Sequence, residues 1–248
     1  MSANAPETYV AGVDGCRAGW LVVLREIADR QPLQMRLVAS FADVLALPEA
    51  PRIIAIDIPI GLAERTTTGG RRADIEARQR LGARQSAVFS VPARAAVMET
   101  DYVRACAVAQ RHSDPSKKVS KQAFHLFPKI REVDDLMTPA MQNRVIECHP
   151  EGAFVSLNDG VPLLLPKKIK SRLNPEGLAM RRDLLERGGF PRAFTEAKPG
   201  RSADVGRDDL LDACACAWTA GRVVAGTALR LPPDPPLDAK GLRQEIWA

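Results

Sequence analysis

The sequence predicts an α/β protein in which a mixed β-sheet is covered by helices on both faces. Three observations predict this class. The first 40 residues read as three strands joined as antiparallel neighbours, and residues 53–62 (IIAIDIPIGL) read as a strand buried on both faces. Helical segments, one more strand and a final helix then follow. The 248 residues suffice for one core and contain no Ser/Gly-rich linker, so we expect a single domain over 1–248.

The antiparallel strands are expected near the amino terminus. Residues 8–15 (TYVAGVDG) form a short apolar strand that ends at an acid and a glycine, and residues 16–27 (CRAGWLVVLREI) resume the apolar character after a tight turn. Polar and apolar residues alternate over 33–40 (LQMRLVAS). Ser40 is then placed to cap a short helix over 41–50.

A helical insertion is expected over residues 64–141, where segments such as 73–85 and 93–110 have helical character between Pro- and Ser-containing loops. Residues 143–149 return to a strand, which Pro150 ends.

Two further helices are expected in the last third of the chain. Residues 175–189 (PEGLAMRRDLLERGG) place Pro175 at a helix start and Gly188 at its end. The small side chains of 208–226 (DDLLDACACAWTAGRVVAG) suit a helix that lies close against a sheet. From about residue 231 the chain is Pro-rich, and we expect an irregular tail.

Composition excludes several classes. No apolar run approaches the roughly 20 residues of a membrane span. The first ten residues lack a secretory pattern, so we expect a cytoplasmic location and no membrane partner. The cysteines are odd in number, without a C-x-x-C pair, and are expected as reduced thiols rather than zinc ligands. They are Cys16, Cys106, Cys148, Cys214 and Cys216.

The net charge of +5 and pI near 9.1 suit a polyanionic partner without specifying one. Basic residues concentrate in residues 71–94 and 167–187. Each stretch is either a solvated helix face or part of a surface that contacts phosphate groups. The aromatic fraction of 5% disfavours base stacking as the main mode of recognition.

Acids at the ends of the predicted elements suggest a metal site. Asp14 ends the first strand, Asp57 follows four apolar residues of the fourth, and Asp209 and Asp212 share one face of the last helix. If the two strands are neighbours, these carboxylates converge, and a hard divalent cation, Mg²⁺ or Mn²⁺, relieves their repulsion. Each acid also has a structural explanation: turn chemistry for Asp14, backbone hydrogen bonds for Asp57 and helix capping for Asp208 or Asp209.

Six motifs, in order over residues 9–225, resemble the family named domain of unknown function 429, whose members are predicted RNase H-like nucleases. They are YVAGVDGCRAGWLVV, IIAIDIPIGL, RRADIEARQRLGARQSAVFSVPAR, SKQAFHLFPKIREVD, ECHPEGAF and DDLLDACACAWTA.

The resemblance implies an RNase H-like fold with a five-stranded mixed sheet. Through its similarity to the RuvC-type resolvases, it implies catalytic acids at Asp14, Asp57, Asp209 and Asp212. Glu147 is a further candidate, with Glu151 as its rival and a structural role as the alternative. The resolvases carry glutamate where this chain has Asp57. They also act as dimers, which makes a homodimer an expectation.

The resulting expectation is a metal-dependent nuclease that acts on DNA or RNA by a two-metal mechanism. Asp14 bridges the metals, while Asp57 and Asp212 flank them. The phosphate-contacting candidates are Arg17, Arg71, Arg72, Arg78, Arg84 and Ser86, although residues 82–94 also read as a packing loop.

Two other classes remain open. A non-catalytic module that binds nucleic acid or protein is the first alternative. The second, an actin-like or sugar-kinase-type phosphotransferase, is disfavoured because no second phosphate-binding glycine turn is found.

Overall fold

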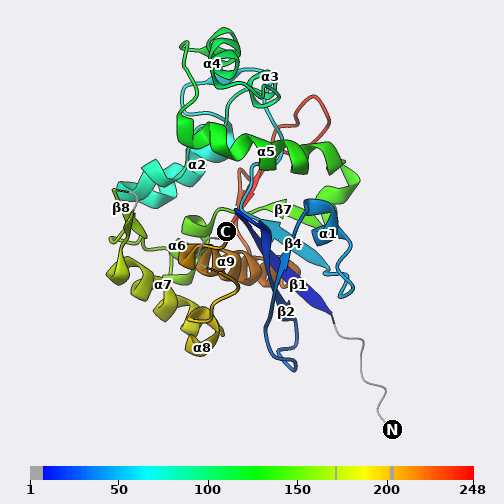
Figure 1. Ribbon diagram of the computed structural model, residues 1–248, viewed down its shortest axis with the longest axis vertical. Coiled ribbons are helices and arrows are strands. Elements are labelled where there is room, and N and C mark those ends of the chain that lie inside the picture. Colours follow the sequence, from blue (N-terminus) through cyan, green and yellow to red (C-terminus); the bar gives the residue numbers. More distant parts are fainter. Residues whose placement is uncertain (1–7, 171, 202–203) are drawn as a thin grey trace. The chain divides into compact units, whose positions relative to one another are not determined.

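A computed structural model describes residues 8–170, 172–201 and 204–248 (Figure 1). The chain divides into two compact units. The first runs to Asp57 and resumes over Lys167–Ala228, and the second comprises Ile58–Pro166 and Leu229–Ala248. The expected helical insertion at 64–141 lies within the second unit.

The main sheet has five strands in the order β3-β2-β1-β4-β7, with the first four in the first unit and β7 formed by Val145–Glu147. Strands β1 (Tyr9–Cys16), β2 (Gly19–Glu26) and β3 (Gln34–Val38) are antiparallel neighbours, and β4 (Ile53–Ile56) runs parallel to β1. The predicted mixed sheet and its antiparallel beginning are confirmed.

One face of this sheet receives helix α9 (Arg207–Val224), which lies along β1 in Figure 1. Gly12 makes this approach possible: a Cβ atom there would lie 2.0 Å from the Ala213 carbonyl oxygen and 2.1 Å from the Ala217 nitrogen. The small residues of the helix and of β1 therefore pack backbone against backbone, as the composition of residues 208–226 indicated.

The opposite face is covered by helix α1 (Phe41–Leu45). Its Phe41 ring lies 5.7 Å, centroid to centroid, from the ring of Trp20 in β2. Side chains alternate between the two faces along a strand, so Trp20 and Val23, three residues apart in β2, point to opposite faces. Val23 pairs with Gly12 on the face that receives α9, so Trp20 lies on the other face. Ser40 caps α1 as predicted, because its hydroxyl accepts a hydrogen bond from the Asp43 amide at 3.2 Å.

The first unit is completed by α7 (Pro175–Arg187), α8 (Arg192–Thr195) and the hairpin of β8 (Lys168–Ile169) and β9 (Arg172–Leu173). Helices α7 and α8 contact α9. The expected boundaries of α7 are confirmed: Pro175 begins it and Gly188 is its C-cap.

The second unit is mainly helical. One of its hydrophobic core clusters joins α2 (Arg72–Leu81), α6 (Pro150–Leu157) and the two strands near the carboxyl terminus, through Ala77, Leu81, Val155, Leu231 and Ile246. Its elements are β5 (Thr66–Thr67), α2 (Arg72–Leu81), α3 (Arg94–Val97), α4 (Tyr102–Arg111), β6 (Ser113–Asp114), α5 (Lys121–Leu136), β7 (Val145–Glu147), α6 (Pro150–Leu157), β10 (Arg230–Leu231) and β11 (Ile246–Trp247), with 3-10 turns at Gly82–Ala87 and Ala140–Asn143.

Two details differ from the sequence prediction. Residues 93–110 form two helices, because the Asp101 carboxylate caps α4 by accepting a hydrogen bond from the Arg104 amide at 2.8 Å. The segment after residue 231 is largely irregular, as expected, yet it buries Leu242, Ile246 and Ala248. The tail is therefore part of the second unit's core.

None of the helices in the described ranges combines the length and apolar character that a membrane span requires.

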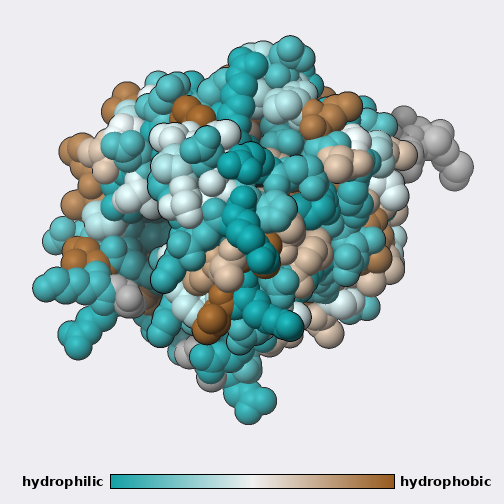
Figure 2. All heavy atoms as spheres, turned by 90° about the horizontal axis from the view of Figure 1, so that it is seen from above, coloured by the Kyte–Doolittle hydropathy of each residue, from teal (hydrophilic) through white to brown (hydrophobic). Residues whose placement is uncertain are grey.

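Hydrophilic side chains cover most of the face seen in Figure 2, with hydrophobic ones in small separate groups among them.

Candidate functional site

Asp14 and Asp57 lie beside each other at the end of two parallel strands. The Asp57 amide continues the β1–β4 pairing by donating a hydrogen bond to the Val13 carbonyl at 3.0 Å. Gly12 and Ala55 are register partners, and Asp14 and Asp57 each lie two residues further on, so all four share one face. That is the face on which α9 packs. Asp14 is buried, with 8% of its surface exposed.

The first turns of α9 bring further acids to this face. Asp212 immediately precedes Ala213, the residue that packs against Gly12, and is buried. Asp209 accepts a hydrogen bond from the Gly206 amide at 2.7 Å, which makes it the capping acid of the helix. The capping role considered for Asp209 is therefore present in the structure.

Two lysines accompany these acids. The ammonium group of Lys167 contacts the Asp212 carboxylate, and the Nζ atom of Lys168 lies 2.6 Å from an oxygen of Asp208. About a quarter of the Lys167 side chain is exposed, against 3% for Asp212. We call Asp14, Asp57, Asp208, Asp209 and Asp212, with Lys167 and Lys168, the acid cluster.

The carboxylates of the acid cluster interact electrostatically. Burial raises the pKa of Asp14 well above its ordinary value, and the charges of Asp57, Asp212 and Asp209 raise it further, against the opposing effect of Lys167. Burial disfavours the charge of Lys167 too, but its pKa is raised overall by Asp212, Asp57 and Asp14. Lys167 is therefore a permanent cation among these three acids.

Asp209 shows a weaker form of the same effect. Burial raises its pKa, and Asp208 and Asp212 add to the rise, while the hydrogen bond from Gly206 and the charge of Lys168 lower it. Because one of its oxygens caps the helix, Asp209 has less freedom than Asp212 to serve as a ligand.

The acid cluster suits a hard cation by its chemistry but is not arranged around one. Five carboxylates face two ammonium groups, so an excess of negative charge is left wherever the carboxylates are ionised, and oxygen ligands are those that Mg²⁺ and Mn²⁺ prefer. Within the described part of the chain, however, no three His, Cys, Asp or Glu side chains stand in a metal-binding arrangement. Lys167 is a counter-ion of Asp212, so a cation bound to this carboxylate would be repelled by the Lys167 ammonium group.

Glu147 belongs to the second unit and forms a buried ion pair with Arg71. Its two oxygens accept hydrogen bonds from the Arg71 guanidinium at 2.6 and 2.8 Å, and one of them also accepts a hydrogen bond from the Ile60 amide at 2.7 Å. Arg71 further binds Asp74 at 2.7 Å. The structural alternative considered for Glu147 is therefore observed. Arg71, expected to contact phosphate, is 1% exposed and has carboxylate partners instead, which removes it from the phosphate-contacting candidates.

The other basic candidates of α2 differ in accessibility. Arg72 is exposed and its Nε atom lies 2.8 Å from Glu76. Arg78 is half-buried and donates to the Val88 carbonyl at 2.9 Å and the Ser90 hydroxyl at 3.1 Å. Arg78 thereby fixes the loop that follows α2, which supports the packing interpretation of residues 82–94.

The remaining candidates are placed as follows. Arg17 and Ser86 are exposed, and Arg84 is half-buried. Glu151, the rival of Glu147, is buried in the first turn of α6.

The two lysines of the acid cluster, Lys167 and Lys168, were not predicted individually from the sequence. They were counted only among the bases of the stretch 167–187. The available signal was the surplus of acids, which calls for a nearby base, but nothing local to Lys167 distinguishes it from Lys168 or from Lys170.

The fold and the acid cluster define an α/β protein with a carboxylate-rich face on a mixed sheet. A family model described as "Protein of unknown function (DUF429)" matches residues 12–237. The chain therefore belongs to the domain of unknown function 429 family, and the family resemblance is confirmed. Neither the curated proteins nor the solved structures contain a match.

Proposed function

We propose that this protein is a divalent-metal-dependent nuclease of RNase H-like fold, which hydrolyses phosphodiester bonds in nucleic acid. The observation that carries the proposal is the convergence of Asp14, Asp57 and Asp212 on one face of the sheet, from two adjacent parallel strands and the helix packed on them. The basic net charge of +5 adds support, since the partner is a polyanion.

The proposed ligands are Asp14, Asp57 and Asp212, with Asp14 between the other two. Bound Mg²⁺ or Mn²⁺ would activate water and stabilise the leaving oxygen. The protein's part is to hold three carboxylates in a largely buried setting, where burial and the neighbouring acids raise the pKa of Asp14. Asp14, Asp57 and Asp212 would hold the cation, whose charge would favour the ionised form of Asp14, and Lys167 would lie close enough to these acids to contact the phosphate.

A non-catalytic binding module is the second candidate, and one observation favours it. Lys167 already contacts Asp212, and the described acids do not form a ready metal-binding group. In that case the charge of Lys167 is the permanent counter-ion of the acid cluster. The two candidates differ in their response to divalent metal, which stabilises the nuclease but leaves the thermal unfolding of the binding module unchanged.

The test is cleavage of a panel of duplex, single-stranded, hybrid and four-way-junction substrates with Mg²⁺ or Mn²⁺. Wild type, Asp57→Asn and the control Asp135→Asn, at an exposed residue of α5, are compared. We expect wild type and Asp135→Asn to cleave at least one substrate and Asp57→Asn to lose about 10²-fold or more in rate. Equal cleavage by all three proteins would refute the site, and substrate binding without any cleavage would favour the binding module.

A further inference from the structure

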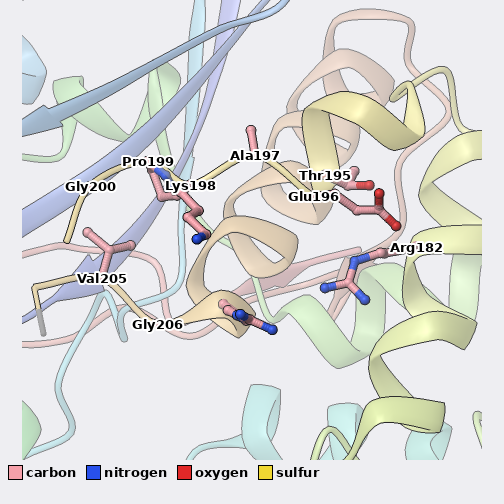
Figure 3. Close-up of a pocket in the computed structure, with 10 residues that line it drawn as sticks. Arg182, Thr195, Glu196, Ala197, Lys198, Pro199, Gly200, Val205 and Gly206 are labelled. Carbon is pink, nitrogen blue, oxygen red and sulfur yellow. The ribbon is translucent and has the colours of Figure 1, made fainter. Parts of the chain in front are cut away.

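A second feature of the first unit has no role in the acid cluster. It is a cavity of about 300 Å³ at the beginning of α9 (Figure 3). Its wall is formed by residues of α7, of α8 with the segment after it, and of the first turn of α9. The charged and polar residues among them are Arg182, Thr195, Glu196, Lys198 and Arg207.

The described side chains of this wall carry more bases than acids: Arg182, Lys198 and Arg207 are basic and Glu196 is acidic. The Asp208 and Asp209 carboxylates of the acid cluster lie beside Gly206, another residue of the wall. No described carboxylate forms an ion pair with any of the three bases, whereas Lys167 and Lys168 on the same unit are both paired. The Nε atom of Arg182 is buried and has no hydrogen-bond partner among the described residues. A buried guanidinium donor without a partner is costly unless a ligand satisfies it.

We propose that this cavity binds a phosphate group of the nucleic-acid substrate, adjacent to the phosphodiester that is presented to the acid cluster. A phosphate offers several acceptor oxygens to guanidinium and ammonium donors that converge from different elements. The helix N-terminus contributes little on its own, because the Gly206 amide already donates to Asp209.

The position of the cavity fits a substrate that also reaches the acid cluster. Arg207 precedes Asp212 by five residues in α9, which corresponds to roughly 7.5 Å along the helix axis. The cavity and the acid cluster therefore lie at neighbouring turns of one helix, a separation of the order of one or two nucleotides of a bound strand. This step rests on the proposed function; phosphate binding in the cavity does not.

The first experiment measures binding without catalysis. Fluorescence anisotropy in EDTA gives the Kd of a labelled single-stranded oligonucleotide with a 5′-hydroxyl end, for wild type and for the triple variant Arg182→Gln, Lys198→Gln, Arg207→Gln. We expect the variant to bind about tenfold more weakly or worse. The slope of log Kd against log salt should fall by about one for each phosphate that the variant no longer neutralises.

A matched control removes the same charge elsewhere. Three exposed bases of the second unit serve as the control triple variant, Arg104→Gln, Arg111→Gln, Lys121→Gln. If both triple variants bind equally, net charge explains the weaker binding and the cavity is not a phosphate site. Circular dichroism spectra of all proteins establish that each is folded.

Glu196→Gln gives a result that misfolding cannot imitate. Removal of this carboxylate of the wall is expected to tighten binding by about two- to threefold, since a negative charge no longer opposes the phosphate. Unchanged or weaker binding by Glu196→Gln would contradict the proposal.

Two further ligands identify which kind of phosphate group binds in the cavity. Inorganic phosphate and the same oligonucleotide with a 5′-phosphate are compared with the 5′-hydroxyl form. Preference for the 5′-phosphate that depends on Arg182 indicates a terminal phosphate, and equal binding of both oligonucleotides indicates a backbone phosphodiester. Loss of binding in the cavity variant together with an inactive wild type would retain the phosphate site and reject the nuclease. Cleavage by wild type, together with unchanged oligonucleotide binding by the cavity variant, would retain the nuclease and reject the phosphate site in the cavity.

Discussion

The ammonium group of Lys167 contacts the carboxylate of Asp212, one turn into the helix that packs on the sheet. This pair gives the acid cluster a counter-ion that belongs to the chain itself. Under the proposed function, a divalent cation at Asp212 would compete with Lys167, and the apparent metal affinity would include the free energy of separating the pair.

Replacement of Lys167 tests this competition. We expect Lys167→Met to lower the stability of the metal-free protein by about 1–3 kcal/mol, because it removes the ammonium group that contacts the buried Asp212 carboxylate. Addition of Mg²⁺ should then raise the Tm of Lys167→Met more than that of wild type. Lys121→Met, at an exposed residue, is the control. An identical Mg²⁺-dependent rise in all three proteins would exclude competition between Lys167 and metal.

The raised pKa of Asp14 predicts a stability that depends on pH. From about pH 4, the ordinary pKa of an aspartate, up to the raised pKa of Asp14, the folded state binds a proton that the unfolded state has released. The contribution of Asp14 to stability is therefore lost as the pH rises through this window.

Asp14→Asn removes that dependence. In EDTA we expect the variant to have a higher Tm than wild type at pH 8, and the difference to shrink towards pH 4. Saturating Mg²⁺ should reverse the order at pH 8, because only wild type retains the complete ligand set. Urea or thermal unfolding at several pH values measures both effects. A difference in Tm that is constant from pH 4 to pH 8 would show that Asp14 titrates normally.

The acids at the strand ends could be predicted from the sequence because local patterns place them. A four-residue apolar run precedes Asp57, and a strand with a following turn carries Asp14, so each position follows from its own neighbours. The Ser40 cap and the ends of α7 were predictable for the same reason, since Ser, Pro and Gly act within one turn of a helix.

The ion pairs could not be predicted in this way. Arg71 and Glu147 are 76 residues apart in the sequence, and Lys167 and Asp212 are 45 apart. Which of several arginines in a basic stretch is buried depends on the tertiary fold, which no local pattern encodes. Arg71 and Arg72 are adjacent and chemically identical, yet one is buried and the other exposed.

This contrast gives a matched pair of variants. We expect Arg71→Ala to destabilise the protein by about 3–5 kcal/mol, because it leaves Glu147 and Asp74 as buried carboxylates without a cation. Arg72→Ala should change the stability by no more than about 0.5 kcal/mol, since its ion pair with Glu76 is exposed. Urea unfolding distinguishes the two. Comparable destabilisation in both variants would mean that Arg71 does not stabilise the second unit through this pair.

The last prediction concerns the close approach of α9 to β1 and compares two glycines of the first unit, Gly12 and Gly221. A Cβ atom at Gly12 would collide with the backbone of Ala213 and of Ala217, which no side-chain rearrangement relieves. Gly12→Ala is therefore expected to cost about 3 kcal/mol or more and to displace α9. Gly221 lies in the same helix, and a methyl group added to it would meet no described atom within 4 Å, so Gly221→Ala should stabilise the protein by about 0.5–1 kcal/mol.

Opposite signs for the two substitutions in thermal unfolding are the expected result. Because α9 also carries Asp209 and Asp212, Gly12→Ala should in addition abolish any stabilisation by Mg²⁺, even at temperatures where the variant stays folded. Gly221→Ala should retain it. A Gly12→Ala protein with the wild-type Tm and an unchanged response to Mg²⁺ would contradict the packing of α9 on β1, and with it the convergence of the acids that this packing produces.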